Sequence, residues 1–554
     1  MNRADVKKVL DGLLFNDLKS NNEKLINLIE KLVDKVEALE ENLQKSADEI
    51  TRLKGEKGKP KFRKQTNADD GTASNTNHSS EEYRKERGDK PPRQPKSKKK
   101  GILHIDRTII VEFDKDNLPG DVIFKGYETR VIQDLKIVTD NIEFKLPCYY
   151  SPSLKKSFIA DLPKGYQGEF GPGIRALIIT LYRDSGMTQP ALDRFFQTFN
   201  IHIAKSTLSK MITEGHELFH QEKEDIITAG IKMHPYQHID DTSCRVNGKN
   251  HYTHVLCNPF FTAYFTRAHK DRLTILEFLC RGVLKFKLDD FTYEILKEFR
   301  LSEKLITDLK NIACDDLMTR NELDDILMRV FTDPMKYLAT RHLIRESSAI
   351  AYYHGTTYAI EHLVCDDAKQ FNNIGKNKAL CWVHEGRHYK KLSPVYEEHR
   401  KVLDNFIGEF WDYYHALRGY QKNPSEILAK ELAERFDELF SQETCYIALN
   451  ERIALSFSKK ESLLTVLKFP FVLLHNNPAE LGARVQARMR DINLQTISEN
   501  GTKTKDTFAT LVQTARKLGV NLFNYVYDRV TEKFEMPSLA NLIVERSTNL
   551  PNTA

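Results

Sequence analysis

Residues 236–267 read YQHIDDTSCRVNGKNHYTHVLCNPFFTAYFTR, and this stretch decides the fold class. It holds three runs rich in β-branched and aromatic residues, YQHID, YTHVLCN and FFTAYFTR. Two further runs of this kind, HLVCDD and ALCWVH, occupy residues 362–367 and 379–384. Strand-like runs that alternate with helical patterns are typical of an α/β domain. We expect this domain to span residues 229–540.

Two long segments within the expected α/β domain are patterned as helices. Residues 286–345 are charged and contain TYEILKEFRLSEKLITDLKNI, and residues 395–465 form a second helical stretch. Both are interpreted as helical insertions. The chain then passes through HNNPAELGARVQARMRD to a last expected helix at residues 503–520.

Residues 166–228, ahead of the α/β domain, are patterned as three successive helices. The third is expected to run from Ala204 to Phe219, and Lys205, Ser206 and Thr207 lie at its start. Two helices joined by a short turn, with such residues at the start of the second, match a helix-turn-helix that contacts DNA. Three-helix packing without any DNA contact fits the same pattern.

Residues 101–165 predict a small β module. The runs ILHIDRTIIVEF, DVIFKGYETRVI and DLKIVTDNIEFKL are rich in Ile, Val, Phe and Thr and are separated by turn-forming residues. We expect a strand in each run.

The N-terminal part of the chain predicts an oligomerisation helix and a linker. Apolar residues recur at alternating steps of four and three over residues 22–53, so residues 1–55 are expected to form a coiled coil. A single amphipathic helix docked on the body is the alternative. Residues 56–100 are polar with two Lys/Arg clusters, which predicts a basic disordered linker that either contacts DNA or only keeps the chain soluble.

Composition limits the class of protein. The 554 residues carry a net charge of +5, with 40% hydrophobic and 29% charged residues, which is a polar globular composition. The 8 cysteines form no CxxC pair, so neither a disulfide framework nor a cysteine zinc cluster is expected. No apolar run suits a membrane span, and the N-terminus lacks the pattern of a secretory signal. A cytoplasmic protein without a membrane partner is expected.

Three acidic residues are placed where structural elements are expected to begin or end. Asp240 ends the run YQHID, Asp366 follows HLVC, and Glu480 lies at the start of the helix in HNNPAELGAR. Such carboxylates can meet above a sheet edge and hold Mg²⁺, which prefers oxygen ligands. Two ions about 3.5–4 Å apart can activate a nucleophile and stabilise the leaving oxygen in phosphoryl transfer.

The same acids have ordinary explanations that the residues alone leave open. Asp at a strand end is often a turn former. Glu480 fits a capping box with Asn477 as N-cap and Pro478 at the first helical position. Because neighbouring strand residues point to opposite faces, only one acid of each pair, Asp240-Asp241 and Asp366-Asp367, is expected to face the ions.

Other residues carry weaker signals. Cys381 and His384 have the spacing of a two-ligand clip, but a closed zinc site needs four ligands, so no zinc is expected. His234 and His238 are separated by Pro235 and are interpreted as core or surface residues. A group of arginines near Glu480 either holds phosphates or covers an exposed helix face: Arg484, Arg488 and Arg490.

At these residues the sequence resembles the insertion-sequence-66 family of bacterial transposases, over roughly residues 20–535. HIDDTSCRVNGKNHYTHVL resembles the family strand whose first acid is catalytic, which selects Asp240. VCDDAKQFN and LCWVHEGRHYKKL resemble the segment of the second catalytic acid and the following Cys-Trp-x-His-x-x-Arg strand, which selects Asp366. HNNPAELGARVQARMRD resembles the Asn-Asn-x-x-Glu-x-x-x-Arg helix, with Glu480 as the catalytic acid and Arg484 as its arginine.

The resemblance implies a multidomain α+β protein whose catalytic domain is ribonuclease-H-like. Two Asp residues on strands and one Glu on a helix would hold two Mg²⁺ ions, which Mn²⁺ can replace. The enzyme would cut DNA at the element ends and join the freed 3′-hydroxyls to target DNA. Its partners would be double-stranded DNA, further copies of the chain in a dimer or larger oligomer, and accessory proteins. Arg387, Arg484 and Arg488 are then candidate DNA contacts, beside Lys205, Ser206 and Thr207.

The sequence also departs from the family pattern. The region after the linker holds only Cys148 in place of a cysteine zinc finger, so we expect a degenerate module without metal. Asp367 replaces the usual Gly after the second catalytic acid, which predicts a change in the local turn or in the charge at the metal site. An inactive or repurposed DNA-binding protein and a nuclease that cuts without joining therefore stay as alternatives.

Overall fold

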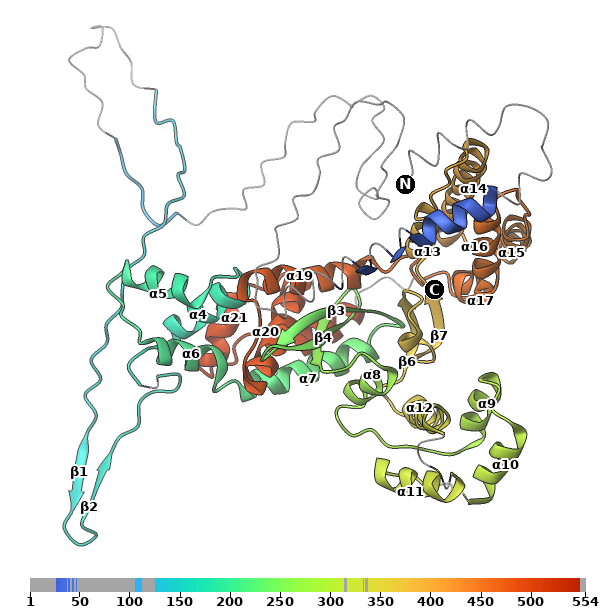
Figure 1. Ribbon diagram of the computed structural model, residues 1–554. Helices are drawn as coiled ribbons and strands as arrows, with labels where there is room; N and C mark the ends of the chain where they lie inside the picture. The colour runs from blue at the N-terminus through green and yellow to red at the C-terminus, as the bar shows by residue number, and fades with distance from the viewer. Residues whose placement is uncertain are drawn as a thin grey trace. The chain divides into compact units, whose positions relative to one another are not determined.

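The computed structural model describes 26–36, 38–39, 42–43, 46, 105–111, 125–166, 168–312, 316–331, 333 and 337–548. Figure 1 shows the elements in chain order. The chain divides into two compact units, one of residues 1–72, 163–194 and 202–554 and the other of residues 73–162 and 195–201. The multidomain α+β class is confirmed. Within the described residues, no helix is long and apolar enough to cross a membrane.

A mixed five-stranded sheet forms the centre of the larger unit, in the order β5-β4-β3-β6-β7. β3, β4 and β5 are antiparallel neighbours, whereas β6 runs parallel to both β3 and β7. The strands are β3 (Tyr236–Val246), β4 (Lys249–Cys257), β5 (Thr262–Arg267), β6 (Ile360–Cys365) and β7 (Gly375–Leu380). The α/β character expected from residue 230 onward is present.

Alternation of side chains gives the sheet two differently covered faces. Ile239, Leu256 and Ala263 point into a large apolar core that includes Ile226 and Ile227 of α7 (Glu217–Lys232). Val255 and Tyr264 belong to a small cluster on the other face. α19 (Asn477–Asn493) packs on β3 and β4, and α20 (Glu499–Lys517) packs on β5. Figure 1 shows both helices in red and orange beside β3 and β4.

Side chains of α20 bond the outer edge of β5. The N–H groups of Thr262, Tyr264 and Thr266 donate to Thr514, Thr510 and Asp506 at 3.3, 3.1 and 2.6 Å. Four residues on a helix and two on a strand both rise by about 6 Å, so the two rows stay in step. The expected last helix is α20, but it is followed by α21 (Leu522–Val530) and α22 (Leu539–Thr548), and α22 packs on α7 beyond the expected domain end at residue 540.

Residues 382–468 form a helical region with its own aromatic core. Its buried side chains include Trp382, Phe410, Tyr413 and Phe436. The helices are α13 (Trp382–Lys390), α14 (Glu397–Lys422), α15 (Glu426–Phe440), α16 (Ile447–Phe457), α17 (Lys460–Leu463) and α18 (Thr465–Lys468). The expected helices of residues 395–465 are present, and α17 and α18 pack on β7 at the edge of the sheet.

The charged block of residues 286–345 is also helical. Leu296, Leu309 and Leu323 are buried in the main core, and Phe286 pairs with Met318 in an isolated β-bridge. The helices are α8 (Arg272–Leu279), which precedes the block, then α9 (Asp290–Glu298), α10 (Glu303–Ile312), α11 (Arg320–Val330) and α12 (Leu338–His354). Its charged faces therefore cover an apolar side that belongs to the core of the sheet.

Helices also precede the sheet, with one difference from expectation. α4 (Pro172–Arg183), α5 (Gln189–Gln197) and α6 (Lys205–Thr213) lie in the expected stretches. The third helix was expected to continue to Phe219, but it ends before Gly215, which has φ +73°, and α7 begins at Glu217. A positive φ suits Gly and interrupts a helix. α6 packs on α4 and α20.

The smaller unit differs from the expected β module. Its strands are β1 (Cys148–Ser151) and β2 (Lys156–Ile159), an antiparallel hairpin. The three longer strands expected between residues 101 and 146 are wrong where the structure describes them, because residues 105–111 and 125–147 contain no strand. Their apolar side chains are exposed, for example Val111 and Ile132. β propensity reports how well a residue fits a packed sheet face, and these residues have no such face.

The described part of the N-terminal helix docks on the helical region. Ile26 packs with Val395. The buried Glu30 carboxylate accepts the N–H groups of Val395 and Tyr396, at 2.6 and 2.8 Å, at the start of α14. The later residues of the heptad seam are exposed, namely Leu32, Val36, Leu39 and Leu43. The helix is therefore docked on its own chain, and Ile29 of the expected seam packs in that contact, while the later seam residues are open. Residues 47–55 lie outside the described residues.

Candidate active site

Asp240 and Asp366 occupy equivalent positions on neighbouring strands. The parallel pairing of β3 with β6 joins His238 to Val364, and both aspartates lie two residues further on. Two residues further along a strand, the side chain returns to the same face. Asp240 on β3 and Asp366, the residue after β6, are therefore at the same level on neighbouring backbone segments about 4.8 Å apart. Asp366 directly follows β6 as expected, but the expectation that Asp240 ends its strand is wrong, because β3 continues to Val246. Asp240 instead lies where β6 stops pairing with β3.

Asn476 fixes the start of α19 beside Asp240. Its side chain donates to the carbonyl of Ile239 at 2.8 Å and contacts His238 Nδ1 at 3.1 Å. Its backbone N–H donates to Cys381 Sγ at 3.2 Å. Asn476, and not Asn477, is the N-cap residue, and it makes no side-chain capping bond, so the alternative that Glu480 belongs to a capping box is wrong. The side chain that would cap the helix is used to hold it on β3.

Gly482 lets α19 approach the sheet closely. A Cβ at this position would lie 2.7 Å from Cγ1 of Val255, which pairs with Asp240 across β3 and β4. The hydroxyl of Tyr264 donates to the Gly482 carbonyl at 3.2 Å. Glu480, two residues earlier in the first turn of α19, is thereby brought to the face of the sheet that carries Asp240.

Electrostatics place the acidic groups in one cluster. The pKa of Asp240 is raised to about 7, first by burial and then by the carboxylates of Asp366, Asp241 and Glu480, while a hydrogen bond from the Asp241 N–H opposes the shift. Neither Asp240 nor Asp366 forms an ion pair within the described part of the chain, and Asp366 accepts the Ala368 N–H at 3.1 Å. Like charges that meet without a counterion raise each other's pKa, and a cation relieves the repulsion.

His384 and Arg387 hold Glu480. His384 Nδ1 lies 3.6 Å from one carboxylate oxygen and an Arg387 nitrogen lies 3.3 Å from the other. Burial lowers the pKa of His384, while the charges of Glu480 and Asp366 oppose that shift. The segment ALCWVH was expected to be a strand, but α13 begins at Trp382, which puts His384 and Arg387 one turn apart on one helix. Arg387 was expected to contact DNA, and in the structure its side chain faces Glu480.

The acidic cluster fits a divalent cation. Glu480 Oε1 is buried and accepts no hydrogen bond, and the cluster supplies the carboxylate oxygens that Mg²⁺ and Mn²⁺ prefer. Cys381, His384 and Glu480 also bring ligand atoms within 4.8 Å of one another. Burial raises the pKa of the Cys381 thiol to about 11, so this sulfur is protonated at neutral pH and is a poor metal ligand. The expectation of no zinc stays a prediction.

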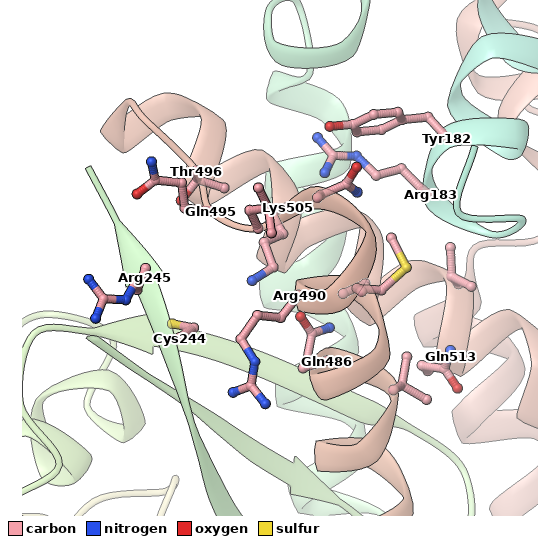
Figure 2. A pocket seen from close by; sticks show the side chains of 16 residues that line it. Tyr182, Arg183, Cys244, Arg245, Gln486, Arg490, Gln495, Thr496, Lys505 and Gln513 are labelled. Carbon is pink, nitrogen blue, oxygen red and sulfur yellow. The ribbon is translucent and has the colours of Figure 1, made fainter. Parts of the chain in front are cut away.

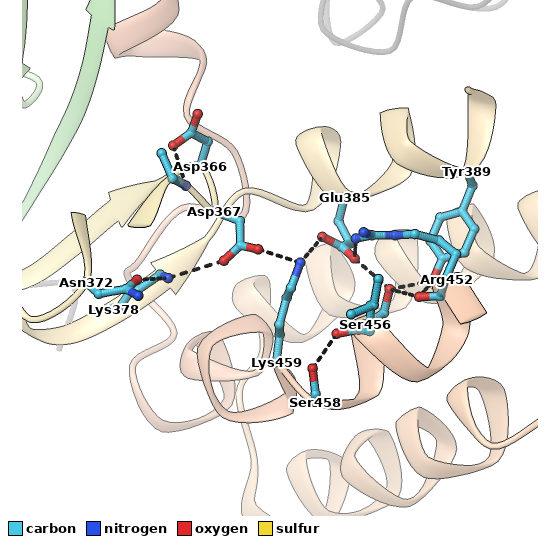
Figure 3. Close-up of polar contacts among 12 residues, drawn as sticks. Asp366, Asp367, Asn372, Lys378, Glu385, Tyr389, Arg452, Ser456, Ser458 and Lys459 are labelled. Carbon is cyan, nitrogen blue, oxygen red and sulfur yellow. Dashed lines mark hydrogen bonds and ion pairs between the residues drawn. The ribbon is translucent and has the colours of Figure 1, made fainter. Parts of the chain in front are cut away.

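Asp367 faces away from the cluster. Its carboxylate pairs with Lys459 at 2.6 Å and Lys378 at 3.4 Å, as Figure 3 shows. Lys459 also lies 3.5 Å from the buried Glu385, which pairs in turn with Arg452. The acid that replaces the usual Gly is therefore neutralised by two lysines, and Asp366 is the member of the pair on the side of Asp240.

The remaining predicted site residues form no hydrogen bond or ion pair with the three carboxylates in the described part of the chain. Arg484 and Arg488 are exposed on α19, and Arg490 donates to the Ser243 carbonyl. At the start of α6, Lys205 and Ser206 are exposed and Thr207 is half-buried. Their contact with DNA stays a prediction.

Three supporting residues were missed as site residues: Asn476, His238 and His384. The sequence could have indicated His384, because CWVHEGR read as a helix places His384 one turn from Arg387. Asn476 and His238 could not be found this way, because their contact joins positions 238 residues apart in the chain.

Comparison with known proteins identifies a class of DNA-mobilising enzymes. A family model described as "Transposase IS66 family" matches residues 167–293 and 339–504, which is more than half of the chain. The chain therefore belongs to the IS66 transposase family, and the resemblance is confirmed. It is also 29% identical over 305 residues to the uncharacterized protein y4jO of Sinorhizobium fredii, covering 55% of this chain and 94% of that protein. The three acids lie inside the matched segments, and residues 294–338 lie outside them.

Proposed function

We propose that this chain is an active transposase that cuts the ends of a mobile DNA element and joins their 3′-hydroxyls to target DNA. The convergence of Asp240, Asp366 and Glu480 from three distant segments carries this proposal. A ribonuclease-H-like domain agrees with two aspartates from neighbouring strands and a glutamate from a helix that packs on the same face.

Each side chain has a separate role in the proposed reaction. Asp240, Asp366 and Glu480 would hold two divalent ions, Mg²⁺ or Mn²⁺. Such ions supply an activated oxygen nucleophile and stabilise the leaving oxygen. His384 and Arg387 orient the Glu480 carboxylate, and Asn476 orients the helix that carries it. The same three carboxylates serve cleavage and joining, since both are displacements at phosphorus.

DNA is held by surfaces outside the carboxylate cluster. Arg484 and Arg488 are exposed on the same helix as Glu480 and are suited to phosphate contacts. Lys205, Ser206 and Thr207 belong to a helix-turn-helix that contacts the element ends. The exposed seam of the N-terminal helix pairs two or more copies of the chain.

The test is a cleavage and strand-transfer assay. Duplexes carry the inverted repeats that flank the coding sequence, and reactions contain Mg²⁺ or Mn²⁺. Asp366→Asn is expected to lower cleavage by about 1000-fold or more, because a metal-bound carboxylate supplies several kcal/mol of charge stabilisation. Asp367→Asn is the matched control, since the neighbouring acid contacts only lysines, and it is expected to retain cleavage within about tenfold.

The outcomes separate three functions. Cleaved and joined products from the wild type, lost in Asp366→Asn, support the transposase. Cleavage without joined product would show a nuclease instead. Tight binding of the ends with no product in either metal would show a DNA-binding protein that has lost catalysis.

A further inference from the structure

A cationic pocket lies at the far end of α19 from Glu480. Figure 2 shows Arg245 from β3, Arg490 from α19 and Arg183 from α4 around one hollow, and Lys505 of α20 completes its charged lining. The hollow is partly open to the surface, and the empty space of about 660 Å³ in and around it includes open solvent.

The protein balances the charge of this pocket only in part, since the Asp506 carboxylate of α20 acts on Arg183 from outside the lining. No acidic residue lines it, and none of its four cations forms an ion pair with a carboxylate in the described part of the chain. Arg183 and Arg245 each donate only to backbone carbonyls, at 3.2 Å to Ile212 and 3.0 Å to Gly248. Arginines held in this way keep donors for a phosphate, which they bind in a fork geometry.

A buried amide adds a different requirement. Gln486 is 4% exposed and lines the pocket, and its Oε1 has no hydrogen-bond partner. This oxygen accepts a hydrogen bond, so its missing partner is an N–H or O–H donor, which a phosphate dianion lacks. The exocyclic amino group of a nucleobase is such a donor, and Gln is a common partner of adenine edges. Apolar side chains of Met489 and Val512 line the same hollow and suit the flat face of a base.

The pocket lies a fixed distance from the acidic cluster. Arg490 is ten residues after Glu480, about 15 Å along the helix, and Arg245 is five residues after Asp240, about 17 Å along the strand. At about 3.4 Å per base step, this separation corresponds to roughly four to five steps of duplex DNA.

We propose that this pocket receives one unpaired nucleotide of the DNA, about four to five base steps from the cut bond, with its base against Gln486 and its phosphates against Arg245 and Arg490. This inference rests on the proposed function, because it takes DNA as the substrate. A base that leaves the duplex loses its pairing and stacking, and a fitted pocket compensates for that loss.

The test compares two kinds of unpaired position in the DNA. Full-length protein is titrated against labelled duplexes of the flanking inverted repeats, with a mismatched base or an abasic site moved through ten positions around the cut. Neither position forms a base pair, so their difference in affinity measures only contacts to the base. The wild type is expected to bind the mismatch about tenfold more tightly than the abasic duplex, as for one buried base contact, at roughly four to five steps from the cut.

Variants test whether the preference for the mismatched duplex over the abasic duplex comes from the pocket. Gln486→Leu is expected to bind the two duplexes equally, because it removes the contact to the base. Arg490→Gln is expected to weaken the binding of both duplexes, because both keep the phosphates. Arg329→Gln, on the exposed face of α11, is expected to keep the wild-type affinity and the preference. Melting curves show whether each variant is folded. Crosslinking of the wild type does not depend on whether a variant folds. 5-Iododeoxyuridine at the preferred position of the DNA is expected to crosslink to the segment of residues 485–496.

Other results would overturn the inference. Equal affinity of the wild type for both duplexes at every position, or crosslinks confined to other segments, would exclude a base in the pocket. Displacement of the DNA by inorganic phosphate as effectively as by dAMP would show a site for any anion. Normal cleavage and joining with no base preference would refute the pocket alone, whereas a base preference without cleavage would refute only the proposed catalysis.

Discussion

Among single residues, Gly482 sets the distance between the helix of Glu480 and the sheet of Asp240. In Gly482→Ala the added methyl group would lie 2.7 Å from Val255 Cγ1, so α19 must shift outward. We expect a loss of about 1–3 kcal/mol in the free energy of unfolding, as for overpacked cores. The cleavage rate of the folded variant is also expected to fall, because small displacements of catalytic groups slow a reaction strongly.

The control for this change is another helical glycine. A Cβ at Gly408 in α14 would meet nothing within 4 Å, so Gly408→Ala is expected to stabilise the protein by about 0.5–1 kcal/mol and to leave cleavage unchanged. Urea unfolding and the end-cleavage assay provide the two readouts. Equal behaviour of both alanine variants would refute the role given to Gly482.

The sequence predicted the acids better than it predicted their supports. Asp240, Asp366 and Glu480 were selected by their sequence contexts, and the structure brings their charges together. Strand alternation alone left the choice between Asp366 and Asp367 open. The ion pairs of Asp367 with Lys378 and Lys459 favour Asp366, and Lys459 comes from a part of the chain that no local pattern connects to β6.

Among elements, the row of polar side chains on α20 replaces a neighbouring strand for β5. Thr510→Val keeps the side-chain shape but leaves the Tyr264 N–H without its acceptor. We expect a loss of about 1–3 kcal/mol in stability, the cost of a buried donor without a partner. Thr307→Val, at an exposed position of α10, is expected to change stability by less than about 0.5 kcal/mol. Similar urea midpoints for the two variants would contradict this role of α20.

The N-terminal helix has one docked side and one open seam. Replacing Leu39 and Leu43 of the seam with Lys is expected to lower the oligomeric mass in light scattering, because charged residues cannot pack in a coiled-coil interface. The docked side, held by Glu30, should be unaffected. Lys35→Gln, exposed on the same helix, serves as the control and is expected to keep the wild-type mass. An unchanged mass in the Lys variant would refute pairing through the seam.

The type of an element was predicted correctly for the long helical patterns. The predictions failed where contacts with distant parts of the chain, or the lack of them, decide the structure. ALCWVH is apolar and short, so it fits a strand or a helix start equally well. The structure makes it the end of β7 and the start of α13, with the N–H of Trp382 bonded to the carbonyl of Leu474. The long strand runs of residues 101–146 failed for the opposite reason, since their apolar residues have nothing to pack against in the described part.

For the whole molecule, buried histidines predict loss of stability in mild acid. Burial and the neighbouring Arg183 and His220 lower the pKa of His216 to about 4, from an ordinary value near 6.5. Between these values the unfolded chain binds a proton that the native chain does not, so stability falls as pH decreases, by at most about 1.4 kcal/mol per pH unit for this group. Other histidines with lowered pKa values act in the same direction: His220, His234, His354 and His362.

The measurement compares urea midpoints at pH 7.5 and pH 5. His216→Gln cannot titrate, so the difference between the two midpoints is expected to be smaller than in the wild type. His202→Gln, at an exposed position, is expected to keep the wild-type difference. An equal pH dependence in all three proteins would show that His216 does not contribute.

The bonded edge of β5 also limits how copies of this chain can assemble. An open strand edge invites the same strand of another molecule, and this is a common route to unintended fibres. Here the outward N–H groups of Thr262, Tyr264 and Thr266 already have acceptors on α20. A second copy therefore finds no free N–H donors of these three residues along this edge of the sheet, so contacts between copies are expected to use other surfaces.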